Sequence, residues 1–307
     1  MKLVSVVVPT YRGAQSLPIL VGRLHAFFIA HNINYELIIV NDASPDNTKE
    51  VLKELKSHYG KITAINLMKN YGQHNAILCG FKYAKGDVVI TMDDDLQNPP
   101  EEIGKLLDGI SKGFDLVIGA YDSKKHSKFR NISGDLVDRV QRFIFNLPNN
   151  FQLTSFRAIR RNLIDNINSM SVPYPYVTSM LLSHTVNYLN VPVRHEKRLY
   201  GKSNYKLKNS IFLILNLVLN YSSIPIYIIA FTLFLSITFV LGFAIYVITS
   251  ILFFDGFIKG WPSMMLLVSF LNMLVMIALM IFGLYLARIY QLTMKAKNSY
   301  VISEIYE

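Results

Sequence analysis

Three consecutive aspartates, Asp93, Asp94 and Asp95, are the part of the sequence most able to perform chemistry. They follow the apolar run VVIT at residues 88–91, which is typical of a buried strand. Carboxylates gathered at a strand end repel one another unless a cation compensates them. Oxygen donors of this kind suit Mg²⁺ or Mn²⁺, which keep waters and bridge to substrate phosphates. The segment therefore predicts a site for a metal diphosphate, and a solvated acidic turn before Pro99 is the alternative.

The spacing of these carboxylates allows two of them to act together. In an extended segment Asp93 and Asp95 point to one side and Asp94 to the other. Asp95, with Asp93 as a second ligand, is therefore the candidate metal clamp. A Cys-rich zinc site and a disulfide framework are excluded, because the chain has one cysteine, Cys79. Cys79 is predicted to be a buried core thiol.

Two further strand ends carry residues that could read a nucleotide. Asp42 follows the apolar residues 37–40, and its carboxylate could accept hydrogen bonds from ribose hydroxyls or a base N–H. The alternative is that Asp42 caps a turn or the next helix. The first apolar run ends in Pro9, Thr10 and Tyr11, where an aromatic ring could border a base. Neither segment decides the function by itself.

The elements that must position these residues alternate along the chain. β-branched runs typical of strands are separated by segments of helical length. Strands are expected at residues 3–8, 36–41, 62–66, 87–92 and 116–119, and helices at residues 16–30, 47–58 and 72–84. This alternation predicts an α/β fold with a mostly parallel sheet and helices on both faces. Ligands of such sheets bind outside the carboxyl ends of the strands, which is where the aspartates lie.

The C-terminal third of the chain is nearly uncharged and strongly apolar. The 307-residue chain has a net charge of +10, yet residues from 211 onward include only four basic and three acidic side chains. Residues 224–254 and 263–287 contain no charged side chain, and each stretch exceeds the roughly 20 apolar residues that cross a bilayer. Two membrane spans are therefore predicted. The basic front half then suits anionic lipid or phosphorylated substrates rather than nucleic acid.

The charges that flank the two spans predict their topology. Both flanks carry basic residues, whereas the connecting residues 255–262 offer one Lys against one Asp. The positive-inside bias therefore places residues 1–210 and the C-terminus in the cytoplasm. Residues 207–221 favour an interfacial helix, and an early start of the first span is the alternative. The predicted organisation is a soluble domain at 1–206, an interfacial helix at 207–222, a transmembrane hairpin at 223–288 and a cytoplasmic tail at 289–307.

Several of these segments together resemble a known family. The motifs that carry the resemblance in the front half are PTY at residues 9–11, VNDASPD at 40–46, NYGQ at 70–73 and MDDDLQNPPE at 92–101. They resemble family 2 glycosyltransferases of the GT-A fold. The later motifs are SFR at residues 155–157, RLYGKSNY at 198–205 and GLYLARIY at 283–290. With these, the chain is similar to polyprenyl-phosphate glycosyltransferases such as dolichol-phosphate mannose synthase and bacterial undecaprenyl-phosphate sugar transferases.

The resemblance implies roles for residues on the donor side. Asp93 would lie near the donor sugar as a catalytic residue. Asp95 and Gln97, also catalytic, would hold the metal diphosphate, with Mg²⁺ or Mn²⁺ as the cofactor. The residues that the resemblance implies for nucleotide binding are Pro9, Tyr11, Asp42, Asn70, Gln73 and Asp94.

On the acceptor side the resemblance implies a second set of residues. The residues implied to approach the lipid phosphate are Arg130, Ser133, Ser155, Arg157, Arg198 and Ser203, with Lys124 and Lys125 as neighbours that are either solvated or facing headgroups. An ion pair with Glu196 is the alternative role of Arg198. Many relatives have Asp where this chain has Ser155, so a base or acceptor-orienting carboxylate has no counterpart here. Relatives also tend to carry Lys at the position of Asn204.

The resemblance implies an inverting, metal-dependent transfer of a sugar from a UDP-linked donor to undecaprenyl phosphate. The location would be the cytoplasmic face of a bacterial inner membrane, and the product would serve lipopolysaccharide or O-antigen modification. The implied partners are the nucleotide-sugar, the polyprenyl phosphate, the membrane and a downstream flippase, without nucleic acid. The sugar itself and a homo-oligomeric state stay open.

Two other functions are alternatives to this one. A processive polysaccharide synthase would share the aspartates but would need more spans and a Gln-x-x-Arg-Trp element. The only tryptophan is Trp261, which follows FIKG at residues 257–260 rather than that element. A non-catalytic membrane scaffold with a decayed nucleotide site is disfavoured by the intact carboxylates.

Overall fold

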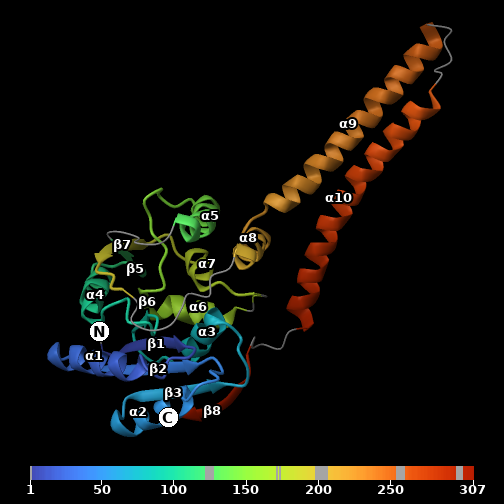
Figure 1. Cartoon of the computed structure of the whole chain (residues 1–307). Helices are drawn as coiled ribbons and strands as arrows, with labels where there is room; N and C mark the ends of the chain where they lie inside the picture. Colours follow the sequence, from blue (N-terminus) through green and yellow to red (C-terminus); the bar gives the residue numbers. More distant parts are fainter. Residues whose placement is uncertain are drawn as a thin grey trace. The chain divides into compact units, whose positions relative to one another are not determined.

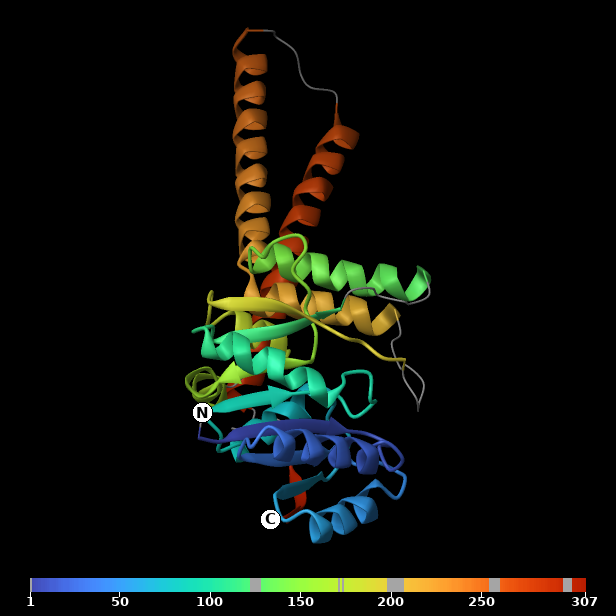
Figure 2. The same cartoon turned by 90° about the vertical axis from the view of Figure 1, so that its left-hand side faces the viewer.

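The computed structural model describes residues 2–121, 128–170, 172, 174–197, 207–253, 260–294 and 300–307. The chain divides into two compact units. One unit comprises Met1–Leu217 and Lys295–Glu307, and the other comprises Val218–Met294. The first unit is an α/β arrangement in which helices cover a central sheet (Figures 1 and 2).

The sheet of the first unit has eight strands in the order β7-β5-β6-β4-β1-β2-β3-β8. The strands that the sequence predicted are β1 (Val4–Thr10), β2 (Tyr35–Asn41), β3 (Ile62–Leu67), β4 (Val88–Thr91) and β5 (Leu116–Tyr121). β1 pairs in parallel with β2 and β4, and β2 pairs in parallel with β3. The predicted mostly parallel α/β sheet is therefore confirmed.

Helices cover both faces of this sheet, because both faces are apolar. All seven residues of β1 are buried, as expected for a strand covered on two sides. On one face the core joins Val4, Val6 and Val8 to apolar residues of α1, α2 and α4. On the other face Gly80 of α3 lies so close to Val7 that a Cβ there would overlap the valine side chain. The helices of this unit are α1 (Leu17–Ala30), α2 (Thr48–His58), α3 (Gln73–Tyr83), η1 (Pro100–Glu102), α4 (Ile103–Ser111), α5 (Lys128–Ile144), α6 (Arg161–Ser169) and α7 (Val177–Leu182).

The register of the parallel strands brings the predicted site residues to one edge. Thr10 at the end of β1 is paired with Asn41 at the end of β2, and Asn41 is paired with Asn66 in β3. Asn41 Nδ2 also donates to Asn66 Oδ1 at 2.8 Å, which links the two strand ends through their side chains. The segments that follow these ends and the end of β4 therefore lie at the same edge of the sheet.

Three strands were not predicted. β6 (Arg157–Arg160) lies antiparallel between β4 and β5, and β7 (Tyr188–Val193) pairs in parallel with β5. β8 (Ile302–Tyr306) lies antiparallel to β3, with Lys49 Nζ 2.6 Å from Glu304 Oε1. The predicted C-terminal tail thus ends as an edge strand of the sheet. Cys79 is buried, as predicted.

Three long helices precede β8. α8 (Leu207–Tyr221) matches the predicted helix, and α9 (Ile224–Phe253) and α10 (Trp261–Met294) follow it. α10 continues several residues beyond the predicted end of the hairpin. α9 and α10 contain apolar stretches of 20 and 21 residues, which are long enough to cross a membrane. Within their unit, Phe239 of α9 packs edge-to-face on Phe270 of α10, with ring centroids 5.7 Å apart.

Candidate active site

Asp93 follows β4 and is held by two neutral side-chain donors. Gln73 Nε2, in the first turn of α3, donates to Asp93 Oδ1 at 2.6 Å. Ser155 Oγ, just before β6, donates to Asp93 Oδ2 at 2.7 Å. Hydrogen bonds to an ionised carboxylate are stronger than neutral ones, so Asp93 has a fixed orientation. Ser155, the position at which the family resemblance leads one to expect a carboxylate, therefore supplies a hydrogen-bond donor to Asp93.

Asp94 points toward β1 instead. Thr10 Oγ1 donates a short hydrogen bond to Asp94 Oδ2, and the backbone of Gly13 lies against both groups, so a Cβ at Gly13 would overlap them. Burial raises the pKa of Asp94 to about 7, the Thr10 hydrogen bond opposes this shift, and the charges of Asp93 and Asp95 add to it. A bound cation would relieve this repulsion.

The carboxylates fit a divalent ion that takes part of its coordination from a substrate. Asp93 and Asp95 are both partly exposed, and Asp95 Oδ1 accepts the Gln97 N–H at 3.1 Å. Among the described residues no group of three or more His, Cys, Asp or Glu converges on one point. Mg²⁺-type sites need only one or two carboxylates when phosphates and waters complete the shell. Asp95 and Asp93 are therefore the side chains that would hold such an ion.

Asp42 fixes the loop that follows β3. Its two carboxylate oxygens accept the N–H groups of Tyr71 at 2.7 Å and Gly72 at 2.8 Å. The pKa of Asp42 is raised above its usual value, because the effect of burial exceeds the opposite effect of these two hydrogen bonds. Gly72 has φ +88°, a left-handed conformation that favours glycine. The observed contacts of Asp42 hold the loop, and each carboxylate oxygen retains a second lone pair with which it could accept a further hydrogen bond.

Gln97 is paired with the segment that follows β7. Its carbonyl accepts the Glu196 N–H at 2.8 Å, and its Nε2 donates to the Glu196 carbonyl at 3.2 Å and lies 3.2 Å from His195 Nε2. The His195 ring stacks on Tyr121 at a centroid distance of 4.0 Å, and the Tyr121 hydroxyl donates to Asn98 Oδ1 at 2.8 Å. The amide nitrogen of Gln97 is therefore engaged by protein, and Gln97 could contribute to a metal site only through its amide oxygen.

Arg157 lies beneath the site as a buried cation. It is 1% exposed, and its Nε and Nη1 donate to Thr91 Oγ1 at 3.0 Å and to Thr178 Oγ1 at 2.9 Å. Burial lowers the pKa of Arg157 to about 10, so the guanidinium stays charged at neutral pH. Burial and the Arg157 charge lower the pKa of neighbouring His74 to about 3. Arg157 was expected to contact phosphate, but here its guanidinium is enclosed by protein.

The remaining predicted residues divide into described and undescribed ones. Pro9 is buried within β1, Tyr11 is 40% exposed, and Asn70 is exposed after β3. Arg130 and Ser133 lie on α5, and their side chains are not among those described. The predicted residues outside the described ranges are Lys124, Lys125, Arg198, Ser203 and Asn204.

The structure adds residues that the motifs did not indicate. Thr10 was expected only as part of a strand end, and here it donates to Asp94. Tyr121 and His195 form the stacked pair beside Gln97. His195 lies three residues before the RLYGKSNY motif, which is the one sequence signal for its place at the site. Nothing in the sequence pattern indicates the role of Tyr121.

The chain matches a family model and known proteins over most of its length. The model of the family "Glycosyl transferase family 2" matches residues 5–171. An undecaprenyl-phosphate 4-deoxy-4-formamido-L-arabinose transferase of Aeromonas hydrophila subsp. hydrophila is 34% identical over 226 residues, covering 73% of this chain and 69% of that protein. A protein of the same name from Enterobacter sp. (strain 638) is 31% identical over 308 residues, covering 98% of this chain and 93% of that protein.

Solved structures resemble the fold of the chain. The crystal structure of a mycobacterial protein has a TM-score of 0.55 and 17% identity, covering 72% of this chain and 75% of that one. Glucosyl-3-phosphoglycerate synthase from Mycobacterium tuberculosis, solved with Mn²⁺, uridine diphosphate and glucosyl-3-phosphoglycerate, has a TM-score of 0.51 and 17% identity, covering 71% of this chain and 79% of that one. The likeness agrees with the predicted GT-A fold. From the family model and the nearly full-length relative, the chain is a glycosyltransferase and belongs to glycosyl transferase family 2.

Proposed function

We propose that the protein transfers a sugar from a UDP-sugar to undecaprenyl phosphate, with inversion and with a divalent metal ion, at a membrane surface. The observation that carries this proposal is the position of Asp42, Asp93 and Asp95 at one edge of a parallel sheet, in a chain that also has two helices of membrane-crossing length. The names of the relatives support the acceptor. The complexes of the mycobacterial synthase support uridine diphosphate and Mn²⁺.

The donor would bind along the ends of β1, β2 and β4. Pro9, Tyr11, Asp42, Asn70, Gln73 and Asp94 are the proposed nucleotide-binding residues. Asp95, Asp93 and the amide oxygen of Gln97 would hold Mg²⁺ or Mn²⁺. When bound, this ion would neutralise the diphosphate that leaves. Ser155 and Gln73 would keep Asp93 oriented toward the donor through the hydrogen bonds described above.

The reaction needs no strong base among the residues of the chain. A phosphate acceptor is already ionised near neutral pH, so one of its oxygens can attack the anomeric carbon directly. The bond between that carbon and the diphosphate oxygen breaks, and the nucleoside diphosphate leaves with the electron pair. A single in-line displacement inverts the anomeric configuration. This account agrees with a chain in which Ser155 stands at the position of the family carboxylate.

The acceptor would approach from the side of α5. Arg130 and Ser133 lie on this helix, and Arg198 and Ser203 are proposed to complete the phosphate contacts. Farther along α5, Leu136 is 48% exposed and Phe143 is 74% exposed. Residues seven apart lie on the same side of a helix, so the two apolar side chains form one stripe. Large apolar side chains presented to solvent beside basic residues support a position close to lipid.

The C-terminal strand β8 supports a hairpin, in which the chain crosses the membrane twice and returns to the side where it began. β8 follows α10 in the chain, yet it pairs with β3 in the same sheet as β1. A sheet cannot be shared across a bilayer, so if α9 and α10 cross the membrane, both ends of the proposed hairpin would lie on the same side as the sheet. Reporters fused after residue 210 and after Glu307 should both report cytoplasm, with a tag at Gly256 reporting the other side. Opposite locations for the two fusions would refute the hairpin.

The function can be tested with the full-length protein in detergent or vesicles. The assay supplies undecaprenyl phosphate, Mn²⁺ or Mg²⁺, and a panel of UDP-sugars that includes the 4-deoxy-4-formamido-L-arabinose donor implied by the names of the relatives. Mass detection should find one sugar per lipid and release of UDP. A long polymer would indicate a processive synthase, and no product with any donor would indicate a non-catalytic scaffold. Reactions without lipid control for hydrolysis of the donor.

A further inference from the structure

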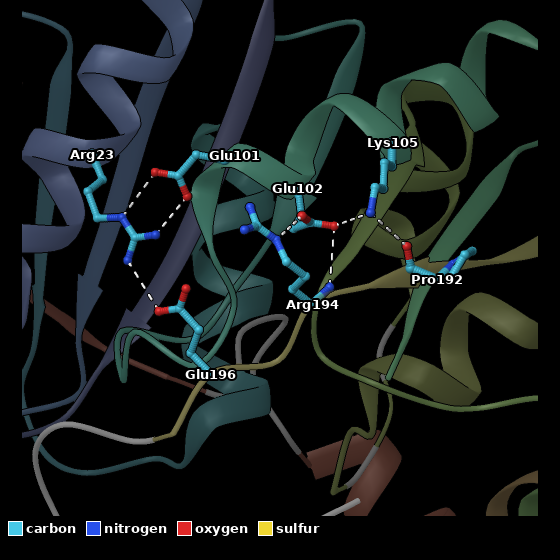
Figure 3. A network of polar contacts seen from close by, with 7 residues as sticks. All are labelled: Arg23, Glu101, Glu102, Lys105, Pro192, Arg194 and Glu196. Atoms are coloured by element: carbon cyan, nitrogen blue, oxygen red, sulfur yellow. Dashed lines mark hydrogen bonds and ion pairs between the residues drawn. The ribbon is translucent and has the colours of Figure 1, made fainter. Parts of the chain in front are cut away.

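Glu102 is a buried carboxylate that the proposed reaction does not use. It is 4% exposed, at the end of η1. Its carboxylate accepts Arg194 Nε at 2.7 Å and the Arg194 N–H at 3.3 Å, and it lies 2.5 Å from Lys105 Nζ (Figure 3). Lys105 Nζ also donates to the Pro192 carbonyl at 3.2 Å. Glu102 therefore fastens the end of β7 to the segment that follows the three aspartates.

The neighbouring Glu101 makes a second attachment to the same region. Arg23 of α1 donates through Nε and Nη2 to the two Glu101 oxygens at 3.1 and 2.7 Å. Arg23 Nη1 also lies 3.8 Å from Glu196 Oε2. In Figure 3 Arg23 reaches both glutamates from one helix. These side chains are partly exposed, so each pair contributes little stability by itself.

Together these contacts connect the segment after the aspartates to the segment after β7 at two points. At one point Glu102 holds Arg194, and at the other Gln97 and Glu196 exchange backbone and side-chain hydrogen bonds. Residues 97–102 and 194–196 are therefore tied to each other twice. The amide of Gln97 takes its orientation from Glu196, whose position depends on where Arg194 is held two residues earlier. A buried carboxylate with three donor groups costs desolvation, so it must be matched by specific contacts.

We infer that the Glu102–Arg194 ion pair is a positioning device for Gln97. The inference rests on the proposed function, in which the amide oxygen of Gln97 faces the metal diphosphate. Glu102 and Arg194 are not among the residues proposed to bind the donor or the metal, and they act by holding residues 195–196 where the Gln97 amide nitrogen can donate to the Glu196 carbonyl. The amide oxygen is then presented to the ion. Residues that orient a ligand in this way change metal affinity by about 10- to 100-fold when they are mutated.

The test measures Mn²⁺ binding directly, by electron paramagnetic resonance of the full-length protein with UDP. Arg194→Ala and Glu102→Gln should each weaken Mn²⁺ binding by about 10-fold, with the same loss in Gln97→Ala. The Arg194 side chain is 66% exposed, and when it is removed Glu102 keeps Lys105 Nζ and the backbone N–H at position 194 as partners. The thermal midpoint of each variant is measured alongside, so that a loss of Mn²⁺ binding in the folded protein is distinguished from unfolding. Arg194→Ala combined with Gln97→Ala should be no worse than Gln97→Ala alone, since residues that act through one another are not additive. Arg194→Lys should recover part of the loss, because it keeps the charge without the planar fork.

Asp115 provides the matched control at the opposite end of β7. It lies 3.4 Å from Arg160 Nε and accepts Thr185 Oγ1 at 3.2 Å and Asn187 Nδ2 at 3.3 Å. Asp115→Asn should leave Mn²⁺ binding unchanged. The inference is overturned if Arg194→Ala binds Mn²⁺ like the wild type, or if Asp115→Asn weakens binding equally. Failure of the proposed metal role is a different result, because the wild-type protein with UDP would then not bind Mn²⁺.

Discussion

Ser155 Oγ donates a hydrogen bond of 2.7 Å to Asp93 Oδ2, although the two residues are 62 positions apart in the chain. Gln73 donates to the other oxygen of the same carboxylate. Asp93 is thus held between two uncharged donors, one from α3 and one from the segment before β6. A carboxylate at position 155 would instead add a further negative charge beside Asp93 and its neighbours Asp94 and Asp95. This chain therefore uses a hydroxyl to orient Asp93 without adding to the repulsion.

Ser155→Ala should lower kcat while leaving UDP affinity unchanged. A hydrogen bond to a charged group contributes about 1.5–3 kcal/mol, and each 1.4 kcal/mol is about tenfold. The expected loss is therefore about 10- to 100-fold, measured as the rate of lipid-linked sugar formation at saturating donor. Ser155→Thr keeps the hydroxyl and should retain most of the activity. Equal losses in the two variants would show that the hydrogen bond to Asp93 is not the cause.

Asp95→Asn should abolish transfer without changing membrane insertion. The neutral amide cannot compensate the charge of a divalent ion as a carboxylate does, so the loss of activity should be at least the roughly 10- to 100-fold that follows removal of a ligand's orienting partner. EDTA should stop the wild-type reaction, and Mn²⁺ or Mg²⁺ should restore it. Asp108→Asn, an exposed position on α4, is the control. Full wild-type activity after rigorous chelation would contradict the metal role.

Asp42→Ala should weaken nucleotide binding before it affects the lipid acceptor. The variant loses a proposed nucleoside contact and also releases the loop N–H groups of Tyr71 and Gly72. UDP affinity, measured by calorimetry, should fall by about tenfold or more, because charge-assisted hydrogen bonds of about 1.5–3 kcal/mol are lost. Asp87→Ala is the matched control, since Asp87 also accepts two backbone N–H groups but at the opposite end of β4. If Asp42→Ala binds UDP as tightly as Asp87→Ala does, Asp42 is not part of the donor site.

Arg130→Ala should show the reverse pattern. The guanidinium is proposed to bind the carrier phosphate through two parallel hydrogen bonds. Efficiency toward lipid phosphate should fall by roughly 10- to 100-fold, the range that a charge-assisted bond of about 1.5–3 kcal/mol predicts. UDP binding should stay near wild type, and Arg130→Lys should recover only part of the loss. Arg139→Ala, at an exposed position of the same helix, is the control. If Arg130→Ala instead weakens UDP binding and leaves the dependence on lipid phosphate unchanged, the proposed position of the acceptor site is wrong.

His74 should make the folded protein sensitive to acid. Its pKa is lowered from 6.5 to about 3 in the fold, so the unfolded chain binds more protons between these values. Stability from this residue is therefore present above pH 6.5 and is lost as the pH falls toward 3, with a slope of at most about 1.4 kcal/mol per pH unit. His74→Gln should flatten the decline of the thermal midpoint between pH 7 and pH 5. A His74→Gln slope equal to that of the wild type would contradict the assignment.

Much of the architecture is encoded locally and could be predicted. The strands β1 to β5 and the helices α1 to α3 follow from apolar runs and their spacing, because a strand or helix is signalled by residues close together in the chain. The aspartates after β4 and the two apolar stretches are equally local. Parallel strands share one edge at their carboxyl ends, so even the position of Asp42 and the Asp93 segment at one edge of the sheet followed from the predicted parallel alternation.

The sequence by itself therefore determined the fold class, the family motifs and the apolar hairpin. Only the tertiary structure decided which distant groups meet: Ser155 with Asp93, Gln97 with Glu196, and Glu102 with Arg194. It also decided that β6 enters the sheet antiparallel and that β8 returns after the hairpin to pair with β3. Such pairings are set by the sheet register and by burial of whole elements. Nothing in the immediate neighbourhood of Ser155 or Ile302 encodes them, because the partner lies many residues away.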